Sequence, residues 1–202
     1  AFRWLCCTVV SENPLPADLQ ERRDCSTIRA NVVANDLRPT GTFVRRAPVP
    51  AMDWTILKKV IDENDSFLIT SHVRPDADAL GSELGLRAIL LALGKKVSIV
   101  NASAPPANLN FMNPPGVILK LNDTVAKANI PKTDVVVIVD TSAWQQLGNM
   151  ADVIQSSSAK RVVIDHHVSS DEMGAIELKD VTAAATGELI CEAAAAFGIE
   201  FD

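Results

Sequence analysis

The chain has 202 residues, a hydrophobic fraction of 48% and a net charge of −6 at pH 7. That length suits one large or two small domains, and the apolar fraction is typical of a protein with a core, not of a disordered chain. An acidic balance argues against a protein that coats long nucleic acids, because such proteins usually present a basic face. A short nucleic-acid substrate held through divalent cations stays open, since bound cations reverse the local field.

The cysteines and the lack of long apolar runs indicate the cellular compartment in which the protein is expected. Cys6, Cys7, Cys25 and Cys191 match no zinc-binding spacing, so free thiols in a reducing environment are expected. No apolar run approaches the roughly 20 residues of a membrane span, and no signal-peptide pattern is present. We therefore expect a cytoplasmic protein that does not cross a membrane.

Residues 1–51 show neither helical nor strand periodicity and are rich in arginine and proline. We expect them to be a disordered or non-native N-terminal extension, with Met52 as a candidate initiator. The catalytic domain is expected to cover residues 52–202.

From residue 52 onward the hydrophobic pattern alternates between helical and strand periods. In chain order it predicts a helix at 54–61, a strand at 66–70, a helix at 80–93, strands at 96–100 and 134–139, a helix at 150–155, a strand at 161–164 and a helix at 183–197. The continuous β-branched run at 134–139 is typical of a strand buried on both faces. Alternating strands and helices predict an α/β fold with a parallel sheet and helices on both faces.

Three clusters of carboxylates and imidazoles come directly after three of the predicted strands. They are His72 with Asp76 and Asp78, then Asp140, then Asp165-His166-His167. Because parallel strands present their carboxyl ends at one edge of the sheet, one crevice would collect all three. Crowded carboxylates repel one another unless cations lie among them, and carboxylates with imidazoles suit Mn²⁺ and similar ions. Paired metals of this kind are the usual solution for phosphodiester hydrolysis.

Each cluster has an ordinary explanation when it is taken alone. Asp76 and Asp78 are common turn or N-cap residues, and His72 is a common surface residue. Asp140 could cap a loop, or act as the nucleophile of another phosphatase class, but that class needs a second Asp where Ser142 stands. The joint order of the clusters on one strand scaffold favours a shared metal site. The helix that opens near residues 79–82 offers backbone N–H groups to a phosphate.

At these residues the sequence resembles the DHH superfamily of phosphoesterases. The first motif of that family, His-x-x-Pro-Asp-x-Asp-Ala-x-Gly-Ser, is matched by His72, Pro75, Asp76, Asp78, Ala79, Gly81 and Ser82. Asp140 matches the second motif and Asp165-His166-His167 the third. The resemblance runs from about residue 52 to residue 202, and residues 183–189 are most similar to the oligoribonuclease and pAp phosphatase (nanoRNase) branch.

The resemblance implies a Rossmann-like domain and a role for each matched residue. The implied metal ligands are His72 and Asp76 for one Mn²⁺ ion, Asp78 and His166 for the other, and Asp140 as a bridge. Gly81, Ser82 and His167 would contact the substrate phosphate, and Asp165 would orient a neighbouring imidazole. The nucleophile would be a metal-bound hydroxide, and Mg²⁺ is an alternative metal.

Two departures from the family pattern bear on function. Gln145-Gln146 stand where relatives often have an arginine before a Leu-Gly pair, which matters for specificity if that arginine contacts substrate. The family's fourth motif, an Asp in an Asp-Thr-Gly-like segment further along, is not found, and its substrate-binding second domain would follow later still. We therefore expect an incomplete catalytic domain, weakly active or inactive by itself.

The leading hypothesis is a Mn²⁺-dependent phosphoesterase, with exonuclease activity on short oligoribonucleotides or phosphatase activity on pAp, and with homodimerisation as an option. One alternative is a non-catalytic, truncated module that binds metal or nucleotide. Another is a relative that acts on pyrophosphate or on cyclic dinucleotides. An Asp-Thr-Gly-like motif beyond residue 202 would favour the enzyme.

Overall fold

The computed structural model describes residues 52–201. The predicted N-terminal extension, residues 1–51, lies outside the described part. Among the described residues, no helix is long and apolar enough to cross a membrane.

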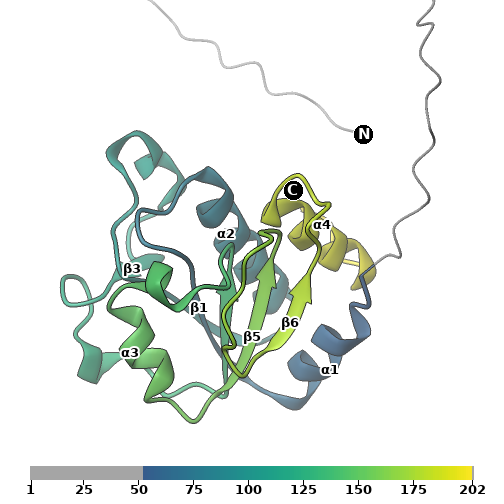
Figure 1. The fold of residues 1–202 in the computed structure, drawn as a ribbon, viewed down its shortest axis with the longest axis horizontal. Coiled ribbons are helices and arrows are strands. Elements are labelled where there is room, and N and C mark those ends of the chain that lie inside the picture. Colours follow the sequence, from purple (N-terminus) through teal and green to yellow (C-terminus); the bar gives the residue numbers. More distant parts are fainter. Residues whose placement is uncertain (1–51, 202) are drawn as a thin grey trace, which may run out of the picture. The chain divides into compact units, whose positions relative to one another are not determined.

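Six parallel strands form one sheet in the order β3-β2-β1-β4-β5-β6 (Figure 1). Their bounds are β1 (Ser66–Thr70), β2 (Lys96–Asn101), β3 (Ile118–Lys120), β4 (Val135–Val139), β5 (Lys160–Asp165) and β6 (Ile176–Lys179). The four strands predicted from sequence are all present. The two that sequence analysis missed are the edge strands β3 and β6, which are short and carry polar residues, so they show no continuous apolar run.

Within residues 52–201, four α-helices surround the sheet, and three 3-10 helices lie in its connections. They are α1 (Thr55–Glu63), α2 (Ala77–Ala92), α3 (Met150–Gln155), α4 (Thr186–Ala196), η2 (Ala107–Met112), η3 (Lys127–Asn129) and η4 (Trp144–Leu147). Helix α2 begins at Ala77, three residues before the predicted start. The reason is an N-cap: Oδ1 of Asp76 accepts hydrogen bonds from the backbone amides of Asp78 and Ala79, at 3.0 and 3.1 Å.

Alternate residues of each strand face opposite sides of the sheet, and each side has its own core. On one side, Phe67 and Val137 pack with residues of α1, α2 and α4. On the other side, Leu68 and Val136 pack with residues of α3 and η4. The result is a three-layer α/β/α arrangement, which confirms the predicted Rossmann-like class.

The strand order fixes where a ligand can bind. The chain runs outward from β1 through β2 to β3, then returns to place β4 on the other side of β1. The reversal leaves a crevice between β1 and β4, just beyond their carboxyl ends, which is where open α/β sheets bind ligands. His72 follows β1 and Asp140 follows β4, so both residues lie at this position.

Candidate metal centre

Asp140 lies at the centre of the site. It directly follows β4, its backbone has a φ of +61°, and the residue is only 2% exposed. Its Oδ2 lies 3.4 Å from Nε2 of His72, and its Oδ1 lies 3.7 Å from Nε2 of His166. The hydroxyl of Thr186 donates to the same Oδ1 at 2.9 Å. One buried carboxylate is therefore approached by groups from three separate segments of the chain.

Predicted site residues come together in two groups that share Asp140; the second group contains His167, which was predicted to contact the phosphate, and does not contain Asp78. His72 and Asp76 form one group with it, and His166 and His167 form the other; within each group the ligand atoms all lie within 4.8 Å of one another. Sequence analysis paired His166 with Asp78, and their Nε2 and Oδ2 atoms are 3.7 Å apart. Separations of 3.4–3.8 Å between imidazole nitrogens and carboxylate oxygens are too long for good hydrogen bonds. Nitrogen and oxygen donors spaced in this way fit around divalent cations.

The electrostatics of His72 point to the same conclusion. The Asp140 carboxylate raises the pKa of His72 to about 9, against the opposing effect of burial. Its other ring nitrogen, Nδ1, lies 2.9 Å from the carbonyl oxygen of Val73. The site thus favours a positive charge at this imidazole, and a bound cation would supply such a charge.

Asp78 is held by a segment that is distant in sequence. Its Oδ2 and Oδ1 accept hydrogen bonds from the backbone amides of Thr186 and Gly187, both at 2.8 Å. These are the first two residues of α4, and Ala185 supplies no side-chain cap. Asp78 therefore caps α4, where the helix dipole also favours a negative charge.

Sequence analysis used residues 183–189 only to choose a branch of the family, and it missed the contacts that Thr186 and Gly187 make. A usable signal was present. A run of small residues at the start of the helix predicted for 183–197 allows another segment to approach the helix N-terminus closely; the helix itself begins later, at Thr186.

Asp165 holds the third cluster in place. It is fully buried, and its Oδ1 lies 2.8 Å from Nδ1 of His167 while its Oδ2 accepts from the hydroxyl of Ser142 at 2.7 Å. Burial would raise the pKa of Asp165, but the hydrogen bonds from Ser142 and His167 outweigh it and hold the pKa below 3.8. The ammonium of Lys179 lies 3.6 Å from Oδ2. Asp165 is thus kept ionised beside the half-exposed His167.

Gly81 and Ser82 lie within α2, not at its first turn, because the helix starts at Ala77. The hydroxyl of Ser82 donates to Oδ1 of Asp78 at 3.5 Å, and Ser82 is fully buried. Contact between the phosphate and Gly81 or Ser82 stays a prediction.

A buried carboxyl group lies beneath the site. Glu83 on α2 is fully buried, and neither of its oxygens has a hydrogen-bond partner; the same is true of Oγ of Ser71 and Nδ2 of Asn101. Burial raises the pKa of Glu83 to about 7. The nearby polar groups of Ser71 and Asn101 lower the pKa, but by less than burial raises it. A buried carboxyl group without partners lowers the free energy of unfolding. Near pH 7 it is protonated, and so uncharged, in a large fraction of the molecules.

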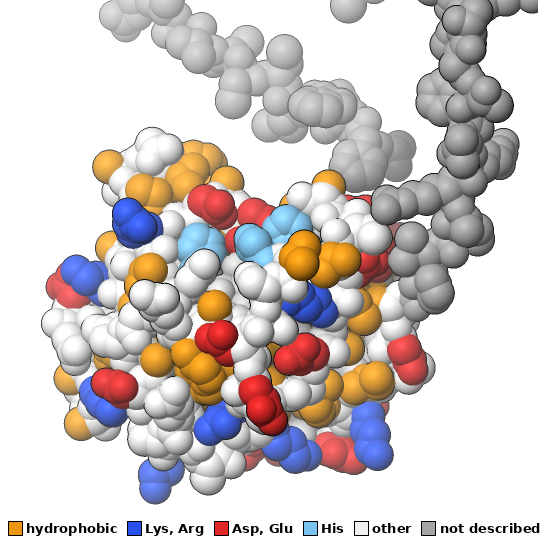
Figure 2. Space-filling model, viewed as in Figure 1, with side chains coloured by type: hydrophobic (Ala, Val, Ile, Leu, Met, Phe, Trp, Pro, Cys, Tyr) orange, Lys and Arg blue, Asp and Glu red, His pale blue; other side chains and the backbone are white. Residues whose placement is uncertain are grey.

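The surface beside the metal centre is hollowed. Figure 2 shows the imidazoles at the surface along the upper edge of the view, with acidic side chains between them. Next to them lies a hollow of about 540 Å³, lined by His72, Val73, Arg74, Gln145 and Gln146. Gln145 and Gln146 stand directly before the Leu-Gly pair of residues 147–148.

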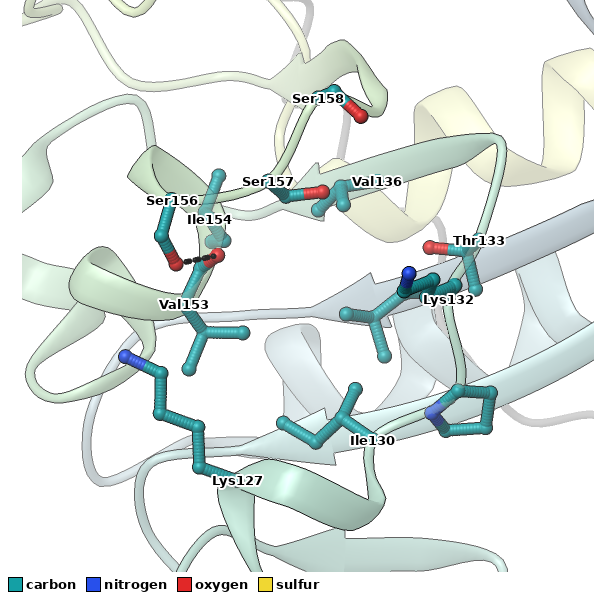
Figure 3. Close-up of a pocket in the computed structure, with 12 residues that line it drawn as sticks. Lys127, Ile130, Lys132, Thr133, Val136, Val153, Ile154, Ser156, Ser157 and Ser158 are labelled. Carbon is teal, nitrogen blue, oxygen red and sulfur yellow. Dashed lines mark hydrogen bonds between the residues drawn. The ribbon is translucent and has the colours of Figure 1, made fainter.

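A second cavity, of about 400 Å³, lies away from this chemistry. Lys127, Ile130, Lys132, Val153 and Ser157 are among its lining residues, as Figure 3 shows. These residues precede β4 and β5 or lie on α3, so the cavity opens at the amino ends of the strands. It contains none of the predicted metal ligands.

Comparisons with known proteins agree with this geometry. The bifunctional oligoribonuclease and PAP phosphatase NrnA of Bacillus subtilis is 30% identical over 138 residues, which cover 68% of this chain and 41% of that protein. The cyclic-di-AMP phosphodiesterase PdeA of Listeria monocytogenes is 30% identical over 146 residues, or 67% of this chain and 22% of that protein. A crystal structure of an exopolyphosphatase-related protein from Bacteroides fragilis has a TM-score of 0.66 and 29% identity, covering 72% of this chain and 43% of that one.

The chain spans less than half the length of each of these relatives. The profile of the DHH family, N-terminal domain, matches residues 66–201. That range includes every strand and all of the predicted ligands, and the chain therefore belongs to the DHH family, as the resemblance of its motifs implied.

Proposed function

We propose that this chain is the metal-binding domain of a divalent-metal-dependent phosphoesterase that hydrolyses short oligoribonucleotides and pAp. The observation that carries the proposal is the convergence of His72, His166 and Thr186 on the single buried carboxylate of Asp140. A buried carboxylate surrounded by imidazoles and further carboxylates is what a pair of bridged cations requires.

The residues that would hold the cations lie around Asp140. His72 and Asp76 would hold one ion, Asp78 and His166 the other, and Asp140 would bridge them; Mn²⁺ suits this donor set, and Mg²⁺ is the alternative. When bound, such ions polarise a phosphoryl group and lower the pKa of water. The amides of Thr186 and Gly187 would keep Asp78 oriented while it binds metal.

His167 is the residue proposed to contact the scissile phosphate. Its side chain is 50% exposed, and Asp165 fixes its Nδ1. That contact favours an imidazole with a proton on Nδ1 and leaves Nε2 facing away from Asp165. An Nε2–H group would donate to a phosphate oxygen as negative charge develops there.

A nucleotide substrate is supported by the relative NrnA, whose name gives oligoribonucleotides and PAP as its substrates, and by one exposed aromatic residue. On η2, Leu109 and Met112 pack toward the core, whereas Phe111 between them is 80% exposed. The methyl group of Met112 would lie 4.0 Å from a Cβ at Gly81, so η2 lies against α2 close to Asp78. Figure 2 shows hydrophobic side chains gathered on a lobe beside the imidazoles. An exposed ring at this rim could stack on a nucleobase.

The test is hydrolysis of a short oligoadenylate and of pAp by this chain, with Mn²⁺ or with a chelator. We expect weak Mn²⁺-dependent release of AMP from both substrates, which Asp140→Ala abolishes. Asp152→Ala, which removes an exposed carboxylate on α3, serves as the control and should retain activity. Because the chain spans less than half of its relatives, Mn²⁺ binding should be measured in parallel. A wild-type chain that binds no Mn²⁺ would overturn the metal centre.

A cyclic dinucleotide is the second candidate substrate, because the relative PdeA is named as a cyclic-di-AMP phosphodiesterase. Hydrolysis of cyclic-di-AMP without hydrolysis of oligoadenylate or pAp would favour it.

A further inference from the structure

We propose that Arg74 forms an anion subsite beside the metal centre and that this subsite binds a second phosphate group of the substrate. The inference rests on the proposed function and adds to it the number of anionic groups that the site recognises. The cavity next to the metal centre, about 540 Å³, is lined by five residues, of which Arg74 is the only permanent cation.

The position of Arg74 in the sequence places it between metal ligands. His72 precedes it by two residues, and Asp76 follows it by two. Its backbone has a φ of +55°, a conformation that residues other than glycine, asparagine and aspartate adopt rarely. Outliers of this kind concentrate at ligand-binding positions, and here the outlier belongs to an exposed residue whose side chain lines the hollow.

The loop that carries Arg74 is firmly held. The backbone amide of Val73 donates to the carbonyl oxygen of Gln146 at 2.7 Å, which ties the loop after β1 to η4. Gly148 packs so closely that a Cβ there would lie 2.7 Å from Cγ1 of Val73. A fixed loop loses little entropy when a ligand binds, so the guanidinium is carried on a preorganised support.

Arg74 makes no contact within the described residues that would account for an arginine at this position. Within residues 52–201 it forms neither an ion pair nor a hydrogen bond with another residue. The neighbouring wall of the hollow carries Gln145 and Gln146, which are exposed and uncharged. A free guanidinium next to neutral amides suits an anion with several oxygen atoms, because the guanidinium binds phosphate through two parallel N–H···O bonds.

The substrate class follows from the position of the hollow beside the metal centre. The phosphate to be hydrolysed would lie at the metals, and the hollow beginning at His72 would receive what is attached to it. A nucleotide with a second phosphate, such as pAp or a 5′-phosphorylated oligonucleotide, would place at Arg74 the phosphate that the product AMP keeps. Adenosine 3′-monophosphate (3′-AMP) carries only the phosphate that pAp loses, so it would occupy only the metal centre.

The experiment compares the binding of two ligands to this chain in the presence of Mn²⁺, by calorimetry. The ligands are pAp and 3′-AMP, each with a 3′-phosphonate that resists hydrolysis. Wild type should bind the pAp analogue at least 10-fold more tightly than the 3′-AMP analogue. Arg74→Gln should weaken binding of the pAp analogue by roughly 10- to 100-fold, as expected for loss of a hydrogen-bonded charge, and leave binding of the 3′-AMP analogue within about twofold. Arg74→Lys should give an intermediate loss, because an ammonium cannot form the paired contact. Arg87→Gln on α2 removes the same charge elsewhere and should change neither ligand.

The outcomes separate this inference from the proposed function. If Arg74→Gln leaves the preference for the pAp analogue over the 3′-AMP analogue intact, the subsite is wrong while the metal centre stands. If Arg74→Gln weakens both ligands equally, Arg74 supports the metal centre and no separate subsite exists. If neither nucleotide binds the Mn²⁺-loaded wild type, the proposed nucleotide substrate falls, and the subsite falls with it.

Discussion

The backbone amide of Thr186 donates a 2.8 Å hydrogen bond to Oδ2 of Asp78, although 108 residues separate them. Gly187 donates a second bond to the other oxygen of the same carboxylate. The N-terminus of α4 is thereby joined to the N-terminal turn of α2, across the crevice where the metal ligands meet. The geometry of one ligand thus depends on a helix that contributes no ligand itself.

The hydroxyl of Thr186 should matter more for metal binding than for folding. Thr186→Val keeps the shape of the side chain but removes the bond to Oδ1 of Asp140, so that carboxylate loses one of its orienting contacts. We expect Mn²⁺ affinity to fall by roughly 10- to 100-fold, as is usual when an outer partner of a metal ligand is lost. Thr182→Val removes an exposed hydroxyl that contacts Asp180 and should have no effect on Mn²⁺. Equal Mn²⁺ affinity in both variants would show that Thr186 does not orient Asp140.

Gly148 is a position where a methyl group should disturb the loop that carries His72. Its φ and ψ are +53° and −134°, and an added Cβ would meet Val73 at 2.7 Å and Ala102 at 3.3 Å. Gly148→Ala should lower the free energy of unfolding by about 1–3 kcal/mol and also weaken Mn²⁺ binding. Gly198→Ala is the control, because Gly198 has a φ of +69° but nothing within 4 Å of an added Cβ. It should lose stability and keep Mn²⁺ affinity; a matching loss of Mn²⁺ affinity would contradict the local explanation.

Glu83 should make stability fall as the pH rises through the neutral range. Burial raises its pKa from 4.5 to about 7 in the folded state. Below pH 4.5 the carboxyl group is protonated in both the folded and the unfolded chain, so its ionisation does not change the free energy of unfolding. Between about pH 4.5 and 7 the unfolded chain releases its proton first, so the free energy of unfolding falls with pH, by about 3 kcal/mol over this window.

The measurement is urea unfolding at pH 5 and pH 8 in the presence of a chelator. Glu83→Gln should remove that part of the pH dependence, because an amide does not titrate. Glu192→Gln, which changes an exposed residue of α4, should keep the wild-type pH dependence. The same slope in Glu83→Gln as in wild type would mean that Glu83 is ionised at little cost in the folded protein.

Phe111 should distinguish ligands that carry a nucleobase from those that do not. If its exposed ring stacks on a base, Phe111→Ala should weaken AMP binding by roughly 5- to 100-fold and leave ribose 5-phosphate unchanged. Phe111→Trp should retain or improve AMP binding, since a larger ring offers more stacking area. Leu91→Ala, at a 43% exposed position on α2, is the surface control. Equal losses for AMP and ribose 5-phosphate would rule out a contact with the base.

The sequence by itself determined the layers of the fold and the residue types of the site. The β-branched run at 134–139 could only be a strand buried on both faces, and the apolar periods on either side of it required covering helices. The three ligand clusters follow strands in the sequence, so a parallel sheet brings them to one edge whatever the details of packing. Their matches to the motifs of the DHH family also came from sequence, and the family comparison agrees.

Tertiary structure alone decided what these residues contact. Local patterns carry no information about partners that are far apart in the chain, such as Asp78 and the amides of Thr186 and Gly187. The burial of Glu83 beside Ser71 and Asn101 depends on how α2 packs over β1 and β2, because a glutamate on an amphipathic helix is usually exposed. The edge strands β3 and β6 likewise exist because neighbouring strands supply their hydrogen bonds, not because their own short sequences favour them.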